Sequence, residues 1–319
     1  MNMFLGIDIG GTYTKAGLLD RDGNILAFAE TDTPKTGGVQ AEIASISEIL
    51  DFFEEPLENV KAIGVGIPGP VDYKGVVFSP PNLNHWGKVD LGRLLSEFFH
   101  FPAQNIIVGN DANFAGLAEY KFGNGAQQDP MIMITLGTGV GGAIIIDGEI
   151  FHGRNGFAGE LGHIVLQPDG PRCGCGRRGC AESFLSHQGI VRIAWEILQK
   201  DKGSILWEMI GGEFELLTPK TIQEASNMGD PASCKILDKV SRFLGIFLAD
   251  LINIFNPQRI VIGGGISKWG KPLIEPAEKV AKKQAMKHIA ENVNIVRAKF
   301  YQKAGVIGAA SAAMSVVDY

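Results

Sequence analysis

The sequence lacks the features that mark membrane, secreted and nucleic-acid-binding proteins. No uninterrupted apolar run reaches the roughly 20 residues of a membrane-spanning helix, and the N-terminal residues lack the basic segment of a secretory signal. Lysine and arginine number 29 against 35 acidic residues, which gives a net charge of −6. Because nucleic-acid binding needs clustered positive charge, we expect a soluble, cytoplasmic protein with no nucleic-acid or membrane partner.

Cysteine is scarce as well, with four in 319 residues. Cys173, Cys175 and Cys180 lie within one short glycine-rich segment, which in a cytoplasmic chain indicates metal binding and not disulfides. His163 completes a Cys₃His set. Four such ligands leave no open coordination position, so the sequence predicts a structural zinc ion. The fourth cysteine, Cys234, falls in a helical pattern, and we expect it in the core.

Glycine, in contrast, is abundant, and the chain is long enough for two domains. Residues 4–10, 15–20 and 24–31 read as three strands, and residues 131–151 repeat the pattern of strand, glycine-rich turn, strand, Asp-Gly turn and strand. A shift of 127 positions places Ile7 on Ile134. We therefore interpret the chain as an internal duplication.

The rest of the chain alternates between helical and strand patterns, which predicts an α/β fold. Further strands are expected at residues 60–67, 105–108, 259–264 and 293–297. Helices are expected at residues 39–54, 90–99, 111–121, 231–256, 272–290 and 303–317. No low-complexity linker divides these segments.

The glycine-rich turns are candidate phosphate sites. Asp8 ends a buried strand and precedes a turn without Cβ atoms, where backbone N–H groups can approach a phosphate and the carboxylate can hold Mg²⁺. The second copy, residues 137–142, spells G-x-G-x-x-G but leads into a strand, which argues against a dinucleotide-binding fold. Residues 265–271 approach a Walker loop, yet Pro272 replaces the hydroxyl that would meet Mg²⁺.

Carboxylates follow at positions that suit a polyhydroxylated ligand. Asp111 stands between a predicted strand and a predicted helix, where it either caps the helix or faces a ligand. Glu160, His163 and Glu182 flank the cysteine cluster. Neutral sugars need such acceptors for their paired hydroxyls.

With these motifs on one chain, the sequence resembles the ROK family of repressors and sugar kinases, and within it the bacterial-type glucokinases. The resemblance extends over essentially the whole chain. Its motifs are DIGGT at 8–12, GIPGPV at 66–71, GNDANFAGLAE at 109–119, LGTGVGGA at 136–143, ELGH at 160–163, CGCGRRGCAE at 173–182 and IVIGGGIS at 260–267.

The resemblance implies a duplicated actin-like (ribonuclease H-like) ATPase fold with two lobes and a central cleft. The small lobe would comprise residues 1–109 and 301–319, and the large lobe residues 110–300 with the zinc-binding loop. The implied activity is transfer of phosphate from ATP to a hexose, with glucose preferred, Mg²⁺ as cofactor and a role in glycolysis. A homodimer or a dimer of dimers is also implied.

The resemblance further assigns roles to individual residues. Asp111 would be the general base that takes the proton of the attacking hydroxyl. The sugar would be held by Gly69, Asn110, Asp111, Glu160, His163 and Glu182. The nucleotide and its metal would be held by Asp8, Gly10, Gly11, Thr12, Lys15, Thr138, Gly139, Gly264 and Gly265.

Other interpretations share part of these motifs. Repressors of the family carry a helix-turn-helix before the first strand, and since DIGGT begins at residue 8 of an acidic chain, we expect none here. A filament-forming or chaperone-like ATPase would need neither the ELGH motif nor the cysteine cluster. N-acetylmannosamine, fructose or allose as substrate, and polyphosphate as donor, stay open, because such discrimination depends on a few contacts.

Overall fold

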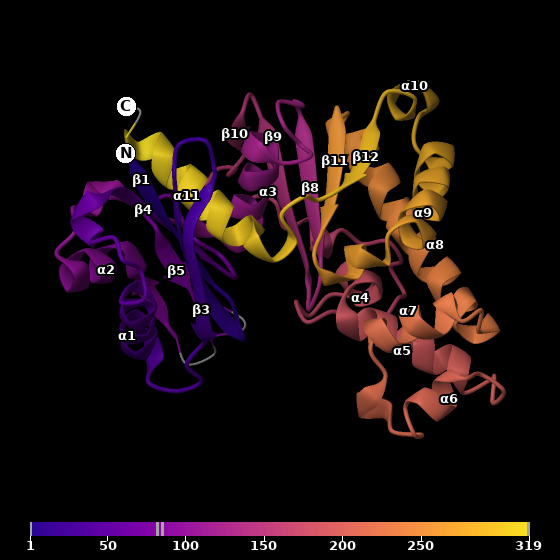
Figure 1. Ribbon diagram of the computed structural model, residues 1–319. Coiled ribbons are helices and arrows are strands. Elements are labelled where there is room, and N and C mark those ends of the chain that lie inside the picture. Colours follow the sequence, from indigo (N-terminus) through magenta and orange to yellow (C-terminus); the bar gives the residue numbers. More distant parts are fainter. Residues whose placement is uncertain (1, 81–82, 84–85, 318–319) are drawn as a thin grey trace. The chain divides into compact units, whose positions relative to one another are not determined.

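The computed structural model describes residues 2–80, 83 and 86–317. Its contacts divide the chain into two compact units. The first comprises Met1–Asp129, Ala143–Gly159 and Lys299–Tyr319, and the second Pro130–Gly142 and Glu160–Ala298. Figure 1 labels many of the helices and strands of both units.

The chain forms two five-stranded sheets with the same strand order. The first runs β3 (Ile25–Asp32), β2 (Tyr13–Leu19), β1 (Met3–Ile9), β4 (Val60–Ile67) and β7 (Ile106–Asn110). The second runs β10 (Glu149–Ile150), β9 (Val140–Ile146), β8 (Met131–Leu136), β11 (Arg259–Gly263) and β12 (Asn294–Arg297). In both, the last three strands are parallel and the first two form an antiparallel hairpin. This repeated order confirms the duplicated α/β architecture.

The predicted helices form, with two differences in extent. The first unit contains α1 (Gly38–Leu50), α2 (Leu91–Phe99), α3 (Asp111–Phe122) and α11 (Ala304–Val317). The second contains α4 (Glu182–Leu185), α5 (His187–Leu198), α6 (Leu206–Met209), α7 (Pro219–Asn227), α8 (Pro231–Phe255), α9 (Lys271–Gln284) and α10 (Lys287–Ala290).

The first helix ends at Leu50, short of the predicted residue 54. The helix expected over 272–290 is broken where Ala285 turns to extended backbone and the N–H of Met286 donates to Asn253. Helices α4 to α7 and the small sheet of β5 (Val76–Phe78) and β6 (Lys88–Asp90) were not predicted.

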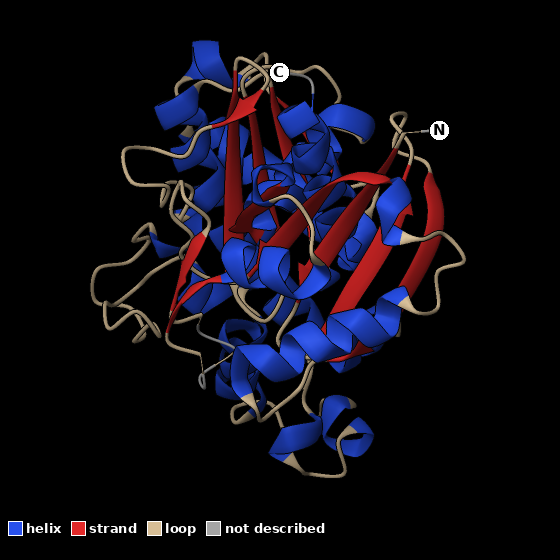
Figure 2. Cartoon of the chain, turned by 90° about the vertical axis from the view of Figure 1, so that its left-hand side faces the viewer, coloured by secondary structure: helices blue, strands red, loops and turns tan. Residues whose placement is uncertain are grey.

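Alternation along β1 gives the first sheet two buried faces. Leu5 and Ile7 belong to the core that includes the apolar side chains of α1 and α2, whereas Phe4 belongs to the core formed with α11. Burial on both faces is typical of strands in a parallel sheet, because helices cover each side. Figure 2 shows this arrangement of helices about the strands.

Helix α11 packs directly against backbone on two sides. A Cβ atom at Gly64 of β4 would lie 1.8 Å from the carbonyl oxygen of Ala309, and one at Gly308 would lie 1.7 Å from that of Phe114 in α3. Only glycine permits approaches this close. The second contact ties α3 to the first unit, whereas the lobe boundary expected from the sequence places residues 110–129 in the large lobe.

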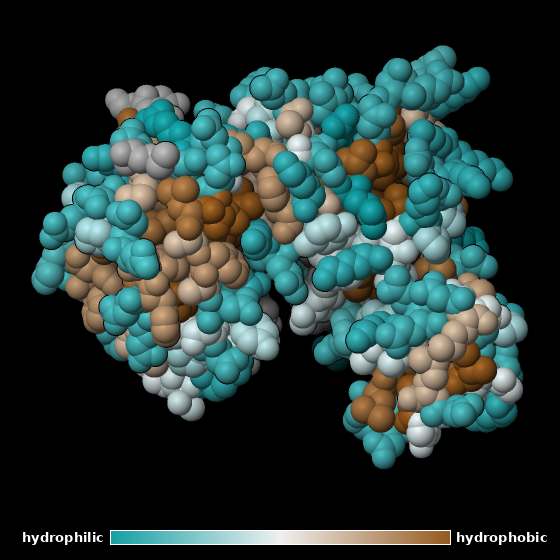
Figure 3. Space-filling model, viewed as in Figure 1, coloured by the Kyte–Doolittle hydropathy of each residue, from teal (hydrophilic) through white to brown (hydrophobic). Residues whose placement is uncertain are grey.

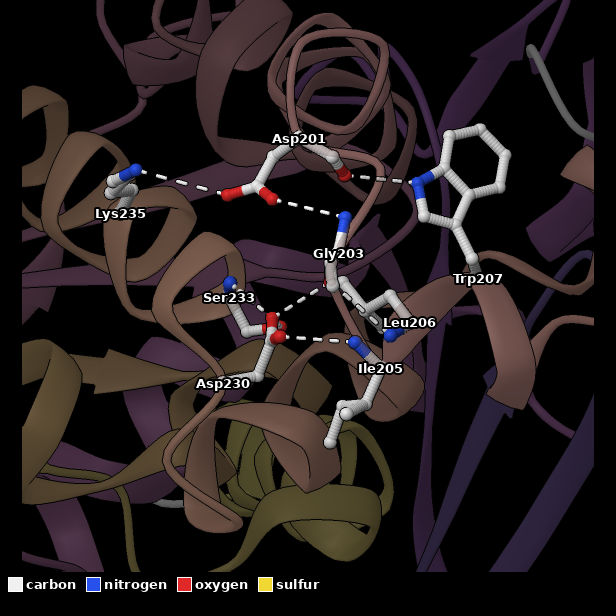
Figure 4. A network of polar contacts seen from close by, with 9 residues as sticks. Asp201, Gly203, Ile205, Leu206, Trp207, Asp230, Ser233 and Lys235 are labelled. Atoms are coloured by element: carbon white, nitrogen blue, oxygen red, sulfur yellow. Dashed lines mark hydrogen bonds and ion pairs between the residues drawn. The ribbon is translucent and has the colours of Figure 1, made fainter.

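The start of α8 is fixed by a buried carboxylate (Figure 4). Asp230 caps the helix by accepting hydrogen bonds from the N–H and hydroxyl of Ser233, and it also accepts from Ser204 and the N–H of Ile205. Burial raises the pKa of Asp230, but these hydrogen bonds outweigh it and lower the pKa overall. The same carboxylate thus holds both α8 and the segment before α6.

Asp230→Ala is expected to lower the free energy of unfolding by about 2–3 kcal/mol, because charged hydrogen bonds are lost and buried donors are left unpaired. The melting temperature should fall by roughly 4–10 °C. Asp201→Ala is the matched control, since Asp201 is more exposed and contacts Gly203 and Lys235 at the edge of the same network. Equal decreases in the melting temperature of the two variants would show that the buried cap stabilises the fold no more than the exposed Asp201.

Most of the surface drawn in Figure 3 is hydrophilic. Within the described parts of the chain, no helix combines the length and apolar character needed to cross a membrane. Cys234, expected in the core, is exposed on α8. The helical pattern was right, but the side of the helix that this residue occupies was not.

Candidate active site

Asp111, the predicted base, and Asp8, predicted to hold the nucleotide and its metal, lie at one edge of the first unit's sheet. The parallel register pairs Asp8 of β1 with Gly66 of β4, and Ile67 of β4 with Asn110 of β7. Asp111 follows directly. Since the carboxyl ends of parallel strands meet at one edge, Asp8 and Asp111 are brought together, and ligands of open α/β sheets bind at such edges.

Asn110, and not Asp111, caps helix α3. Its side-chain oxygen accepts from the N–H of Asn113 at 3.1 Å, and its amide nitrogen donates to the carbonyl of Gly69 at 3.1 Å. The interpretation of Asp111 as the helix cap is therefore wrong. Asn110 joins the turn after β4 to the start of α3, which places Gly69 beside Asp111 in the first turn of the helix.

The carboxyl group of Asp8 is half-buried, in surroundings that disfavour its charged form. Burial and the nearby charge of Asp111 raise the pKa of Asp8 to about 7. Lys15, which pairs with Asp8 from the neighbouring strand β2, opposes the shift. The backbone of Gly305 at the start of α11 lies against this carboxyl group, because a Cβ atom there would come within 2.4 Å of it. Two adjacent carboxyl groups with this electrostatic profile suit a divalent cation, which Mg²⁺ sites build from one or two carboxylates and substrate phosphates.

Asp8→Asn is expected to raise the melting temperature of the protein in magnesium-free buffer clearly more at pH 8 than at pH 5, because at pH 5 only part of the pH-dependent stability has been lost. The folded-state pKa of about 7 exceeds the ordinary 3.8, so stability falls as the pH rises between these values. The variant removes the costly charge, for a gain of roughly 3–6 °C, or about 1–2 kcal/mol. Scanning calorimetry at both pH values measures it, with the exposed Asp22→Asn as control. A gain of equal size at pH 5 would contradict this account.

The first glycine turn has its carbonyl oxygens held by hydrogen bonds from Thr33 and Lys35. The carbonyl of Gly11 accepts from Lys35 at 2.6 Å, and Thr33 donates from its N–H to Thr12 and from its hydroxyl to Gly10. The N–H groups of Gly11 and Thr12 have no acceptor in the described parts of the chain. Carbonyls held by hydrogen bonds beside N–H groups that have no acceptor are typical of an anion-binding turn.

Thr33 and Lys35 were missed in the sequence because they lie more than 20 residues from the turn. The signal that could have found them is the register of the β2–β3 hairpin, which pairs Tyr13 with Asp32. Gly305 carried no comparable signal, because its place beside Asp8 depends on packing of α11 against the sheet.

The second unit carries two glycine turns at the carboxyl ends of adjacent strands. β8 and β11 pair Thr135 with Gly263, so the turns that begin at Gly137 and Gly264 lie at the same sheet edge. Gly264 has a left-handed φ of 82° and packs against the backbone of Leu136. A Cβ at Gly137 or Gly265 would meet nothing within 4 Å, so their backbone is open to a ligand. The expected nucleotide residues Thr138, Gly139, Gly264 and Gly265 are thereby gathered in two neighbouring turns.

Glu182 connects the first of these turns to the cysteine cluster. One carboxylate oxygen accepts from the N–H of Val140 at 3.1 Å, and the other lies 3.4 Å from the sulfur of Cys173. A Cβ at Gly139 would lie 2.7 Å from the same carboxylate. Glu182 therefore holds the glycine turn in place. From the sequence we expect Glu182 only to bind the sugar, so this structural role was not predicted.

The four predicted metal ligands converge. One ligand atom from each of His163, Cys173, Cys175 and Cys180 lies within 4.8 Å of the others. The sulfurs of Cys175 and Cys180 are 3.7 Å apart, and Nδ1 of His163 lies 3.6 Å from the sulfur of Cys173. A tetrahedron with Zn–S bonds of about 2.3 Å has edges of about 3.8 Å, so the spacing fits zinc.

The chemistry of the thiols agrees with this fit. A hydrogen bond from the backbone N–H of Arg177 lowers the pKa of Cys175. Without a cation, however, burial raises the pKa of the Cys173 thiol to about 12 and also raises that of Cys180. Such thiols stay protonated unless a metal ion offsets the cost of ionisation, and a bound metal deprotonates its thiols outright. Nε2 of His163 lies 3.8 Å from the carboxylate of Glu160, so the two ring nitrogens face different partners.

Comparisons with known proteins match nearly the whole length of the chain. The model of the ROK family matches residues 4–315. A glucokinase of Thermotoga maritima is 35% identical over 96% of both chains. The crystal structure of a ROK family glucokinase from Streptomyces griseus in complex with glucose and AMPPNP is 34% identical, covers 98% of this chain and 100% of its own, and superposes with a TM-score of 0.84. The DNA-binding transcriptional dual regulator NagC of Escherichia coli is 32% identical, and the match covers 95% of this chain and 73% of NagC.

Proposed function

We propose, since the chain belongs to the ROK family, that it is an ATP-dependent hexokinase that converts glucose to glucose 6-phosphate. The fold is the duplicated actin-like ATPase fold expected of the family. The observation that carries the proposal is that Asp8 and Asp111 lie near one another at one sheet edge, and that the glycine turn after Asp8 has N–H groups with no acceptor among the described residues. Glucokinase relatives that match almost the whole chain support it.

Asp111 acts as the general base in this proposal. It stands in the first turn of α3, where Asn110 takes over the capping role and Gly69 is fixed beside it. A base within reach of the sugar hydroxyl removes its proton as the oxygen attacks the γ-phosphorus of ATP. Because phosphoryl transfer has a loose transition state, the other residues contribute by positioning and by neutralising charge.

The phosphates are held by the glycine turns. In the first unit the donors are the N–H groups of Gly11 and Thr12. In the second unit, taken by itself, the backbone at Gly137 and Gly265 is open to a ligand. Mg²⁺, when bound at Asp8, neutralises phosphate charge. Lys15 balances the carboxylates around the metal position.

Zinc, when bound by the Cys₃His set, has a structural role in this proposal. It closes the loop that carries Glu160 and Glu182 and orients the ring of His163, so that the second nitrogen can meet a sugar hydroxyl. Contacts of these residues with glucose remain predictions. So do the two-lobed arrangement of the bound state, the homodimer or dimer of dimers, and the cytoplasmic location.

A panel of sugars tests the assignment. Glucose, mannose, fructose, allose and N-acetylmannosamine are each assayed with ATP, and separately with polyphosphate, and kcat/KM is compared. We expect glucose with ATP to give the highest value. A preference of more than tenfold for another sugar would reassign the substrate. The absence of transfer to every sugar would favour a sugar-responsive regulator, for which the similarity to NagC is the supporting observation.

A further inference from the structure

A chain of three buried polar side chains lies beneath the first glycine turn. Thr14 of β2, Thr33 after β3 and Glu42 of α1 are exposed by 0%, 2% and 1%. The carboxyl group of Glu42 lies 2.5 Å from the hydroxyl of Thr14, which lies 3.0 Å from that of Thr33. The Thr33 hydroxyl in turn lies 2.7 Å from the carbonyl oxygen of Gly10. The three contacts connect helix α1 to the turn.

Counting protons along this chain fixes the direction of each hydrogen bond. The carbonyl oxygen of Gly10 can only accept, so the single hydroxyl proton of Thr33 is donated there. The contact between the two hydroxyls then requires the proton of Thr14. No hydroxyl proton is left for the contact with Glu42, so the carboxyl group must itself donate. All three hydrogen bonds form together only when Glu42 is protonated.

The surroundings of Glu42 agree with a neutral acid. Its neighbours in the network are the hydroxyl of Thr14 and, behind it, that of Thr33, and no lysine, arginine or histidine of the described residues forms an ion pair with it. Burial raises the pKa of the carboxyl group. A hydrogen bond donated by Thr14 would oppose this shift, whereas one accepted by Thr14, as the proton count requires, favours the protonated form. An unpaired buried charge is costly, and such groups neutralise instead.

We propose that Glu42 is a protonated positioning residue, which orients the carbonyl of Gly10 through Thr14 and Thr33 and so holds the phosphate-binding turn. The N–H of Thr33 holds the carbonyl of Thr12 in the same way, so the turn is tied inward at both ends. This arrangement leaves the N–H groups of Gly11 and Thr12 directed at the nucleotide. The inference rests on the proposed ATP site but does not depend on which sugar is phosphorylated.

The first test compares variants of Glu42 by their dissociation constants for ATP and their kinetic constants. Glu42→Ala is expected to raise Kd and KM for ATP about tenfold while changing KM for glucose less than twofold. Glu42→Gln supplies a neutral donor of similar shape and should stay within about twofold of the wild type. Ile46→Val, a buried change in the same helix, controls for lost stability. Unchanged ATP affinity in Glu42→Ala, or a Gln variant as weak as the Ala variant, would overturn the proposal.

The second test targets the far end of the chain and remains decisive if Glu42→Ala does not fold. Thr33→Val removes the hydroxyl that holds Gly10 and should weaken ATP binding by a similar factor, whereas Thr33→Ser should restore it. Direct ATP binding separates this outcome from the kinase assignment: a wild type that binds ATP but phosphorylates no sugar refutes the proposed reaction alone. Thr33→Val with unchanged affinity would refute the role of the network.

A spectroscopic measurement reads the protonation state itself. In protein labelled with ¹³C at glutamate carboxyl carbons, the resonance that disappears in Glu42→Gln belongs to Glu42. We expect it at the position of a protonated carboxyl at pH 7. A resonance that titrates at the ordinary value of 4.5 would contradict the inference.

Discussion

Replacing Asp111 by asparagine is expected to lower kcat by about 10²–10⁴-fold while the affinity for glucose changes little. The change removes the base but keeps a side chain of nearly the same shape in the first turn of α3. A general base contributes about this factor to rate. Helix α3 should persist, because Asn110 supplies its cap and α11 packs against it.

The matched control is Asp90→Asn, which makes the same chemical change at the N-cap of α2 in the same unit. Its kcat should stay within about twofold of the wild type. Steady-state kinetics and glucose binding by calorimetry are measured on both variants. If Asp111→Asn keeps more than half of the wild-type kcat, Asp111 is not the base.

Protein purified without chelator is expected to contain about one zinc ion per chain, and Cys175→Ser is expected to lose it. Zinc binding to sites of this kind contributes about 10–16 kcal/mol in small domains, so its loss should unfold the loop between Glu160 and Glu182. The melting temperature should drop by more than about 10 °C, and KM for glucose should rise at least tenfold, because residues expected to hold the sugar flank the loop.

Cys234→Ser is the control for this experiment, since Cys234 is exposed and belongs to no ligand cluster among the described residues. Its zinc content, melting temperature and kinetics should match the wild type. Elemental analysis measures the metal. Wild-type protein that contains no zinc, or a Cys175→Ser variant that keeps its full complement, would show that the cluster is not a zinc site.

The duplicated architecture was predictable because its signal is local and occurs twice. Each copy places a glycine-rich turn after a buried strand and an Asp-Gly turn after the next. In the second copy, Asp147 and Gly148 both have the positive φ that a two-residue hairpin turn requires. The convergence of the predicted metal ligands could be expected for a similar reason, since cysteines and glycines in one short segment are typical of a chelate loop.

Positions that depend on packing between distant segments could not be predicted. The approach of Gly305 to Asp8 requires α11, almost 300 residues later in the chain, to lie against β1. The capping of α3 by Asn110 is a choice between two adjacent residues that both suit the role, and only the backbone conformation decides it. Glu42 gave no signal at all, because an acidic residue in an amphipathic helix is ordinarily exposed.

The most direct test of the central claim identifies the product of the reaction. The protein is incubated with ATP, Mg²⁺ and ¹³C-labelled glucose, and the products are followed by ³¹P and ¹³C NMR. We predict stoichiometric formation of ADP and a phosphate ester on O6 of glucose, with almost no ADP in the absence of sugar. ATP hydrolysis that proceeds equally well without glucose, or no phosphate ester on the sugar, would contradict the assignment of this chain as a glucose kinase.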